Sequence, residues 1–201
     1  MRIINTSIAV PALSDVGNYT FDTYLDYVQQ GIYLWENSPY VKNYPELYFL
    51  NYVLFHRTND EEIKPCRTYF WKKIKDKVQG KAMVEAALEI NHWCAGEVMY
   101  QGTDMRTGSA LEIYRSGVGR CGEEAVFVVN VMRSAGIPAR PVYVPRWSHC
   151  DDNHAWVEVW CDGDWHYLGA CEPEAVLDKG WFTNAASRAM MIGARWYDRA
   201  M

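Results

Sequence analysis

The chain has 201 residues, of which 49% are hydrophobic and 22% charged, and this composition is typical of a globular protein with enough apolar material for a sizeable core. A formal net charge of −5 and the confinement of clustered basic residues to the short run 72–77 argue against nucleic-acid binding. No stretch of about 18 consecutive apolar residues is present, so the sequence contains no membrane-spanning helix.

The N-terminal segment bears on localisation. Residues 1–16 lack the basic region and the long apolar region of a secretory signal. We therefore expect a cytoplasmic protein if the chain is complete, and an exported one if a signal has been removed. Nothing in the sequence separates these two possibilities.

The first half of the chain is predicted to be mainly helical. Apolar residues recur at helical spacing over 21–36, and Pro45 marks the start of a second helix that runs to Phe55. Two more helices are expected over 66–77 and 81–98, the second of them rich in strong helix formers. We interpret residues 1–80 as a helical N-terminal region.

The second half changes character. A short helix over 109–115 and a glycine-bearing turn over 117–120 lead into a helix over 121–135, which Gly136 ends. From residue 139 the hydrophobic period becomes two, which predicts strands before and after the hairpin signal Asp162-Gly163. Helices followed by an antiparallel meander define an α+β fold.

Cys121 is the candidate nucleophile. It follows the glycine turn directly and begins a predicted helix. A thiolate at a helix N-terminus interacts with free backbone N–H groups and with the positive end of the helix dipole, which together lower a thiol pKa. The same N–H groups can hold the oxyanion that forms when sulfur attacks a carbonyl, and Gly119 and Gly122 would allow a substrate to approach the backbone.

His154 is the candidate base. It opens a predicted strand after the polar loop 150–153. A histidine at the start of a strand can present a ring nitrogen to a helix N-terminus packed on the sheet, and it must come within about 3 Å of the sulfur to activate it. Papain-like folds share this chain order of a helix-starting cysteine and a strand-starting histidine.

Residues around this pair have weaker assignments. Arg120 and Glu123 flank the nucleophile and are expected to be structural ion-pair partners. A side-chain oxyanion donor would come from upstream, from Trp93, Tyr100 or Gln101. Five tryptophans late in the chain are expected to be mostly core, with one or two along the acyl groove; they are Trp147, Trp156, Trp160, Trp165 and Trp181.

The cysteine pattern argues against a disulfide scaffold and against a zinc site. None of the six cysteines belongs to a CxxC pair; they stand at positions 66, 94, 121, 150, 161 and 171. Mostly buried, free thiols are therefore expected rather than a disulfide scaffold. The side chains that could bind zinc lack the usual ligand spacing; they are Cys150, Cys161, Cys171, His149 and His166.

Four motifs stand in the order found in a known family. They are GRCGEEA at 119–125, MRSAGIPAR at 132–140, NHAWVEV at 153–159 and DGDW at 162–165. Together they resemble the transglutaminase-like superfamily over roughly Met83 to Trp181, and they look most like its bacterial members. The resemblance implies a papain-like fold, a Cys–His–Asp triad and no required cofactor. It also makes residues 81–201 the transglutaminase-like domain.

The resemblance breaks at the third triad member. The family's Asp stands on the strand after the hairpin, at a place that holds Gly169 here. A glycine cannot orient a histidine, but a bulge in the strand at this point would let the Glu172 carboxylate reach the His154 ring. We therefore predict Glu172 as the orienting residue; the alternatives are Asp152 or no third member.

The expected function is a cysteine-dependent amide-bond hydrolase or acyl transferase acting on a protein, peptide or glycopeptide. Hydrolysis is favoured because no acceptor-amine site is evident. The superfamily includes peptide N-glycanases and microbial proteases, and Cys171-Glu172 with nearby Gly180-Trp181 is similar to the glycanase branch. The alternative is a catalytically impaired binding or scaffolding module, in which the N-terminal helices would make the contacts.

Overall fold

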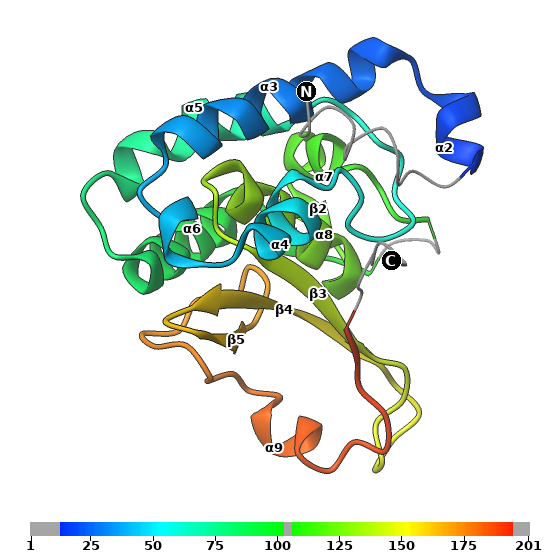
Figure 1. The fold of residues 1–201 in the computed structure, drawn as a ribbon. Helices are drawn as coiled ribbons and strands as arrows, with labels where there is room; N and C mark the ends of the chain where they lie inside the picture. The colour runs from blue at the N-terminus through cyan, green and yellow to red at the C-terminus, as the bar shows by residue number, and fades with distance from the viewer. Residues whose placement is uncertain (1–12, 103–105, 195–201) are drawn as a thin grey trace.

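The computed structural model describes residues 13–102 and 106–194, and Figure 1 shows helices stacked on one face of an antiparallel sheet. The α-helices are α2 (Leu13–Asn18), α3 (Phe21–Asn37), α4 (Glu46–Phe49), α5 (Arg67–Val78), α6 (Met83–Glu97), α7 (Ala110–Ser116), α8 (Cys121–Ser134) and α9 (Thr183–Ala186). A 3-10 turn, η1 (Val41–Asn43), precedes α4, and a π-helical turn, η2 (Leu50–Leu54), follows it.

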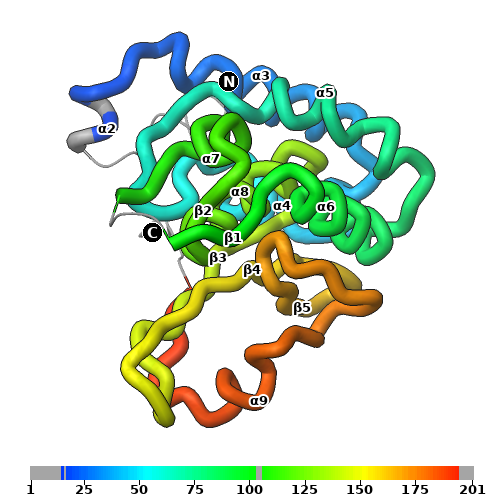
Figure 2. Tube along the Cα trace, turned by 180° about the vertical axis from the view of Figure 1, so that it is seen from behind, coloured from blue at the N-terminus to red at the C-terminus, as the bar shows by residue number. Residues whose placement is uncertain are grey.

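The main sheet has the strand order β5-β4-β3-β6 and is antiparallel throughout. Its strands are β3 (Ala139–Val144), β4 (His154–Cys161), β5 (Asp164–Leu168) and β6 (Gly193–Ala194). A separate parallel pair joins β1 (Met99–Tyr100) to β2 (Val118–Gly119), and Figure 2 shows the two side by side where the chain enters α8. This pair fixes the chain directly before the helix that carries Cys121.

Helix α8 is the central element. It is buried continuously from Glu123 to Ser134 because α5, α6 and α7 cover one side and β3 and β4 cover the other. A helix in that position is expected to be apolar on most of its circumference. The valines and Phe127 of α8 supply this apolar surface and belong to the main core cluster.

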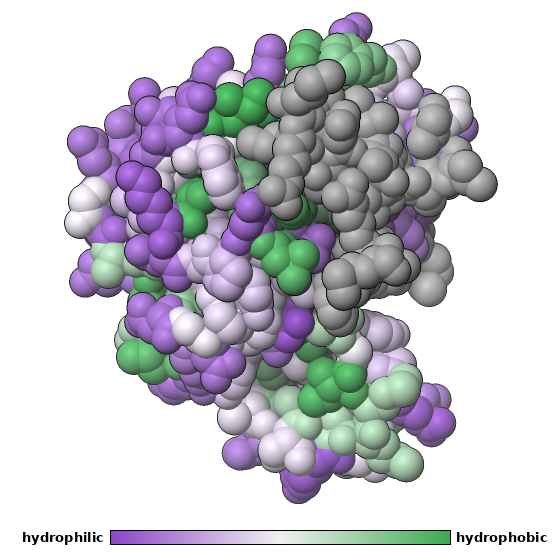
Figure 3. Space-filling model, viewed as in Figure 1, coloured by the Kyte–Doolittle hydropathy of each residue, from purple (hydrophilic) through white to green (hydrophobic). Residues whose placement is uncertain are grey.

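The opposite face of the sheet has a smaller core of its own. Val142, Trp156 and Phe182 pack there with Trp147, so the segment around α9 covers this face. In Figure 1 α9 lies below the sheet, on the side away from α8. Figure 3 shows apolar surface in that lower part of the molecule. The segment that follows α9 carries the exposed apolar side chains Met190, Met191 and Ile192.

The structure confirms the predicted α+β class and most of the long helices and strands. Gly136 ends α8 with φ 84°, and Asp162 and Gly163 form the hairpin turn with φ 53° and 95°. The helix expected to run to Phe55 is instead the short α4 followed by the π-helical η2. The predicted glycine turn before Cys121 contains strand β2, which pairs with the residues after α6.

The core crosses the division expected at residue 80. Phe70 of α5 contacts Phe127 of α8 with ring centroids 5.5 Å apart, and both belong to one buried cluster. The division into residues 1–80 and 81–201 stays a prediction. No helix within the described part of the chain is long and apolar enough to cross a membrane.

Candidate active site

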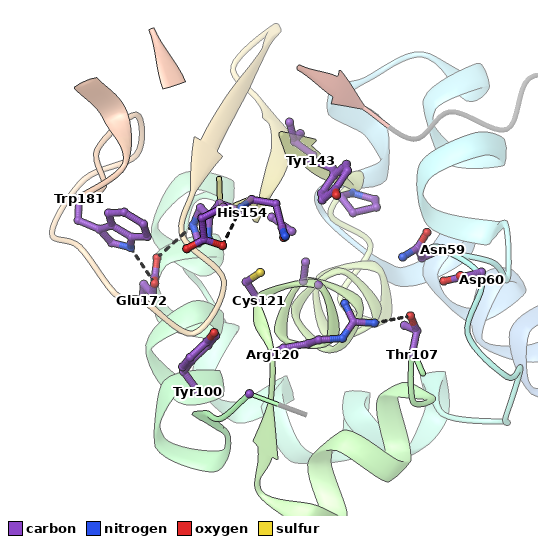
Figure 4. A pocket seen from close by; sticks show the side chains of 18 residues that line it. Asn59, Asp60, Tyr100, Thr107, Arg120, Cys121, Tyr143, His154, Glu172 and Trp181 are labelled. Carbon is purple, nitrogen blue, oxygen red and sulfur yellow. Dashed lines mark hydrogen bonds and ion pairs between the residues drawn. The ribbon is translucent and has the colours of Figure 1, made fainter. Parts of the chain in front are cut away.

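The start of α8 opens onto a cleft of about 680 Å³. Figure 4 shows Glu172 and Trp181 on one side of this cleft and Asn59 and Asp60 on the other, with Cys121 between them. Cys121 and His154 both line the cleft although they come from a helix and from a strand 33 residues further on. The fold therefore brings the two predicted residues together.

Cys121 is placed by a capping arrangement. Arg120, in extended conformation with φ −77° and ψ 166°, precedes the helix, and its backbone N–H donates to Glu123 Oε2 at 3.1 Å. Glu123 Oε1 accepts from the Gly108 N–H, also at 3.1 Å, so this buried carboxylate fastens the loop before α7 to the start of α8. Glu123 is thus a structural capping residue, and its expected part in an ion pair stays a prediction.

The thiol of Cys121 is half-buried, and this burial raises its pKa above the ordinary value. Hydrogen bonds from the backbone N–H groups of Ala155 and Gly122 act in the opposite direction but are outweighed. The sequence predicted a lowered pKa from the helix N-terminus alone, and that prediction is wrong in direction because it left out desolvation. The resting sulfur is therefore a thiol at neutral pH.

The two glycines beside the nucleophile have different uses. A Cβ on Gly119 would lie 3.1 Å from the Cβ of Glu123, so Gly119 packs closely against the cap, and it does not line the cleft. A Cβ on Gly122 would lie 3.0 Å from Arg120 Nη1 at the edge of the cleft. Arg120 is itself held there by Nη2, which donates to the Arg106 carbonyl and to Thr107 Oγ1, both at 3.1 Å.

His154 is neutral in this environment. It is the first residue of β4 and lies opposite Val144, and its ring centroid is 4.8 Å from that of Trp181 and 4.9 Å from that of Phe182. Burial among these rings lowers the pKa of His154 to about 4, and the negative charge of Asp152 opposes this only weakly. A neutral imidazole can accept a proton, which is what a buried thiol requires.

Glu172 faces this histidine across a small gap. Its Oε2 lies 4.0 Å from His154 Nε2, and both atoms are buried without a hydrogen-bond partner. The Trp181 indole N–H donates to the other oxygen, Oε1, at 2.9 Å, and burial raises the pKa of the carboxyl. With Nε2 directed to Glu172, Nδ1 is the nitrogen left for the thiol.

The geometry explains how Glu172 reaches this place. Strand β5 ends at Leu168, and a turn follows in which the Glu172 N–H donates to the Gly169 carbonyl at 3.2 Å. A Cβ built on Gly169 would lie 2.3 Å from Glu172 Oε2. The Glu172 carboxylate therefore occupies the space into which a side chain at position 169 would project. A turn rather than the expected bulge brings it there.

Glu124 is a group that sequence reasoning missed. Its side chain is buried in the first turns of α8, and burial together with the charges of Glu172 and Glu123 raises its pKa to about 8. Two acidic residues at a helix start suggest dipole compensation at the surface. Only the packing of α6, β4 and the 169–172 turn around α8 makes Glu124 a neutral, buried acid.

The other residues that the sequence suggested for the site differ in where they lie relative to the cleft. Asp152, the alternative third member, is exposed and accepts the Asn153 N–H at 2.8 Å. Of the upstream oxyanion candidates, Tyr100 lines the cleft, whereas Trp93 stacks on Tyr114 with ring centroids 6.0 Å apart. Among the described residues no group of three His, Cys, Asp or Glu side chains is arranged to hold a metal ion.

A helix-starting cysteine facing a strand-borne histidine, on an antiparallel sheet, is the arrangement of the papain-like fold. Residues 72–170 match the family model of the transglutaminase-like superfamily, and this part of the chain is a transglutaminase-like domain. The match begins before the expected Met83 and ends just short of Glu172.

Five chains of solved structures match the sequence, two of which follow, while no curated protein matches it. The first is a candidate cysteine protease from Cytophaga hutchinsonii, 16% identical with a TM-score of 0.44, covering 92% of this chain. The chain spans 60% of the length of that protein. The second is LapG from Legionella pneumophila, 17% identical with a TM-score of 0.45, covering 61% of this chain and 68% of LapG.

Proposed function

We propose that the protein is a cysteine-dependent amide hydrolase in which Cys121 is the nucleophile, His154 the base and Glu172 the residue that orients the base. The observation that carries this is the pair of buried, unpartnered atoms His154 Nε2 and Glu172 Oε2, 4.0 Å apart at the edge of the cleft that Cys121 lines. Buried polar atoms without partners are rare and call for an explanation. A contact that tightens when substrate closes the cleft supplies one.

The proposed reaction begins from a neutral pair. As the Cys121 sulfur bonds to the amide carbon, its proton passes to His154 Nδ1 and the carbonyl oxygen becomes an oxyanion beside the N–H groups at the start of α8. The C–N bond then breaks, and the departing amine takes the proton from Nδ1. Water attacks the thioester, again giving its proton to His154, and the acid product leaves with Cys121 restored as a thiol.

Glu172 would act on the charge that develops on His154. For Nδ1 to accept a proton, Nε2 must already carry its own hydrogen, and this Nε2–H is directed to the Glu172 carboxylate. The imidazolium formed in each attack step donates it more strongly, because the ring is then charged. The attraction is strongest in the transition state, when the ring carries charge, and weak at rest, when the ring is neutral.

The substrate proposed is an extended chain, either a peptide segment or a glycopeptide. Tyr100, Tyr143 and Trp181 line the cleft with exposed rings, 68%, 45% and 65% accessible respectively. Aromatic side chains with a large exposed surface suit both peptide and sugar ligands. Water is the proposed acceptor.

The test is a hydrolysis screen with peptide, acyl-glutamine and glycopeptide libraries. The protein should release product from at least one library, and Cys121→Ala should abolish this. Cys150→Ala is the matched control, because it removes an exposed thiol outside the cleft lining and should leave the rate unchanged. Product release that survives in Cys121→Ala would refute the proposal.

A non-catalytic binding module is the second candidate, and the gap between His154 and Glu172 favours it. In such a module the cleft would still bind peptides, and the chemistry would be lost. Cys121→Ala would then bind a peptide as tightly as the wild type, and neither protein would cleave it. Cleavage by the wild type alone excludes this candidate.

A further inference from the structure

The turn that carries Glu172 has an unfavourable backbone. Residues 169–172 form a β-turn closed by the Glu172 N–H and the Gly169 carbonyl at 3.2 Å. Its third residue, Cys171, has φ 57°, in the left-handed region that glycine and asparagine tolerate best. A cysteine there costs about 1 kcal/mol or more relative to its ordinary conformations, so the turn needs support from its surroundings.

Asn91 of α6 supplies support from a distant part of the chain. Its side-chain Nδ2 donates to the Gly169 carbonyl at 2.9 Å and to the Glu172 carbonyl at 3.5 Å. Its Oδ1 accepts from the Cys171 N–H at 3.1 Å. The amide therefore contacts the turn at three points, and it is only 2% exposed.

We propose that Asn91 is a positioning residue for the reaction: it holds the 169–172 turn so that the Glu172 carboxylate stays directed at His154. This role rests on the function proposed above for Glu172, because the turn that Asn91 holds is the one that carries Glu172.

The route from Asn91 to the base is short. The Glu172 carboxylate is linked to α6 by one turn, and its Oε2 is the atom that lies 4.0 Å from His154 Nε2. Asn91 holds the backbone end of Glu172, and Trp181 holds one oxygen of its carboxylate. If the turn relaxed at Cys171, the carboxylate would swing away from the histidine, and a misplacement of about 1 Å can cost up to about 100-fold in rate.

The experiment measures chloroacetamide alkylation of Cys121 by mass spectrometry between about pH 5 and 8, in wild type, Asn91→Leu, Glu172→Gln and the double variant. In this range alkylation reports how readily His154 takes the thiol proton, so it needs no knowledge of the substrate. Gln30→Leu is the matched control: this buried amide on α3 donates to the Ser134 carbonyl at 3.0 Å and is remote from the turn.

The expected result is that Asn91→Leu and Glu172→Gln each lower the rate by a similar factor, and that the double variant is no slower than either. Gln30→Leu should lose thermal stability while keeping the wild-type rate. Adding Cys171→Gly to Asn91→Leu should restore much of the rate, because glycine adopts the left-handed conformation without support.

The proposal would be overturned if the alkylation rate of the double variant fell by the product of the two single-variant factors. A folded Asn91→Leu protein with the wild-type alkylation rate would overturn it as well. If Asn91→Leu does not fold, Asn91→Asp keeps the acceptor for Cys171 and loses the donors, and the same comparison applies. Wild-type alkylation that depends on Asn91 and Glu172, without hydrolysis of any library, would support the positioning role and refute only the hydrolase.

Discussion

Gly169 and Glu172 share one side-chain position beside His154. A Cβ at 169 would lie 2.3 Å from Glu172 Oε2 and 2.8 Å from its Cβ. An acid at 169, as the family pattern has it, and the acid at 172 therefore exclude one another. The chain carries the carboxylate at 172 and keeps 169 as glycine, so under the proposed function the family's third residue is relocated from 169 to 172.

This relocation predicts the outcome of a swap. Gly169→Asp alone should lower Cys121 alkylation near pH 7 and the thermal midpoint, because the new side chain collides with Glu172. Glu172→Gly alone should lower alkylation by removing the acid. The combination of both changes should recover alkylation above either single variant, since the carboxylate introduced at position 169 would then fill the space beside His154 that the Glu172 carboxylate has left. A double variant no better than Glu172→Gly would contradict the relocation.

Elements whose ends are set by local backbone chemistry could be predicted from the sequence. Gly136 and the Asp162-Gly163 turn have the positive φ angles that glycine and aspartate indicate. The pair β1–β2 and strand β6 are two residues long and exist only through distant partners, so no local pattern marks them. The turn holding Glu172 escaped prediction for the same reason, because its support comes from α6.

Helix termination gives a prediction with a close control. Gly136 and Gly80 both have positive φ, 84° and 73°, but a Cβ on Gly136 would lie 2.9 Å from Ser38 Oγ, whereas Gly80 has no neighbour within 4 Å. Each Gly→Ala change should destabilise through backbone strain by about 1 kcal/mol. Gly136→Ala should cost more, measured by urea unfolding, because it also displaces Ser38. Equal losses would show that the contact with Ser38 adds nothing.

In the whole molecule, α8 lies between a helical layer and the sheet (Figure 1), and this position decides how deeply its side chains are buried. This position buries Cys121 in part and Glu124 almost completely, and it reverses the thiol pKa expected from a helix N-terminus. The family motifs predicted which residues meet, because motif order reflects topology. The burial of Cys121 and Glu124 depends on which distant elements pack around α8, and the local sequence pattern does not predict this.

Glu124 predicts a pH dependence of stability. Its folded pKa of about 8 lies above the ordinary value of 4.5, so its contribution is full below pH 4.5 and is lost as pH rises through 8. Glu124→Gln cannot titrate, so its free energy of unfolding relative to wild type should rise between pH 4.5 and 8, by up to about 5 kcal/mol. Urea titrations at several pH values measure this. A difference that stays constant with pH would contradict it.

The most direct test of the central claim is the pH profile of Cys121 alkylation in wild type and His154→Gln. The pKa of His154 is about 4 and that of Cys121 is raised. Between these values the thiol and the imidazole are both neutral, so a wild-type rate that depends on proton transfer from Cys121 to His154 as the sulfur attacks should be flat from about pH 5 to 8. In His154→Gln the rate should rise about tenfold per pH unit. Parallel slopes in the two proteins would show that His154 does not act on Cys121.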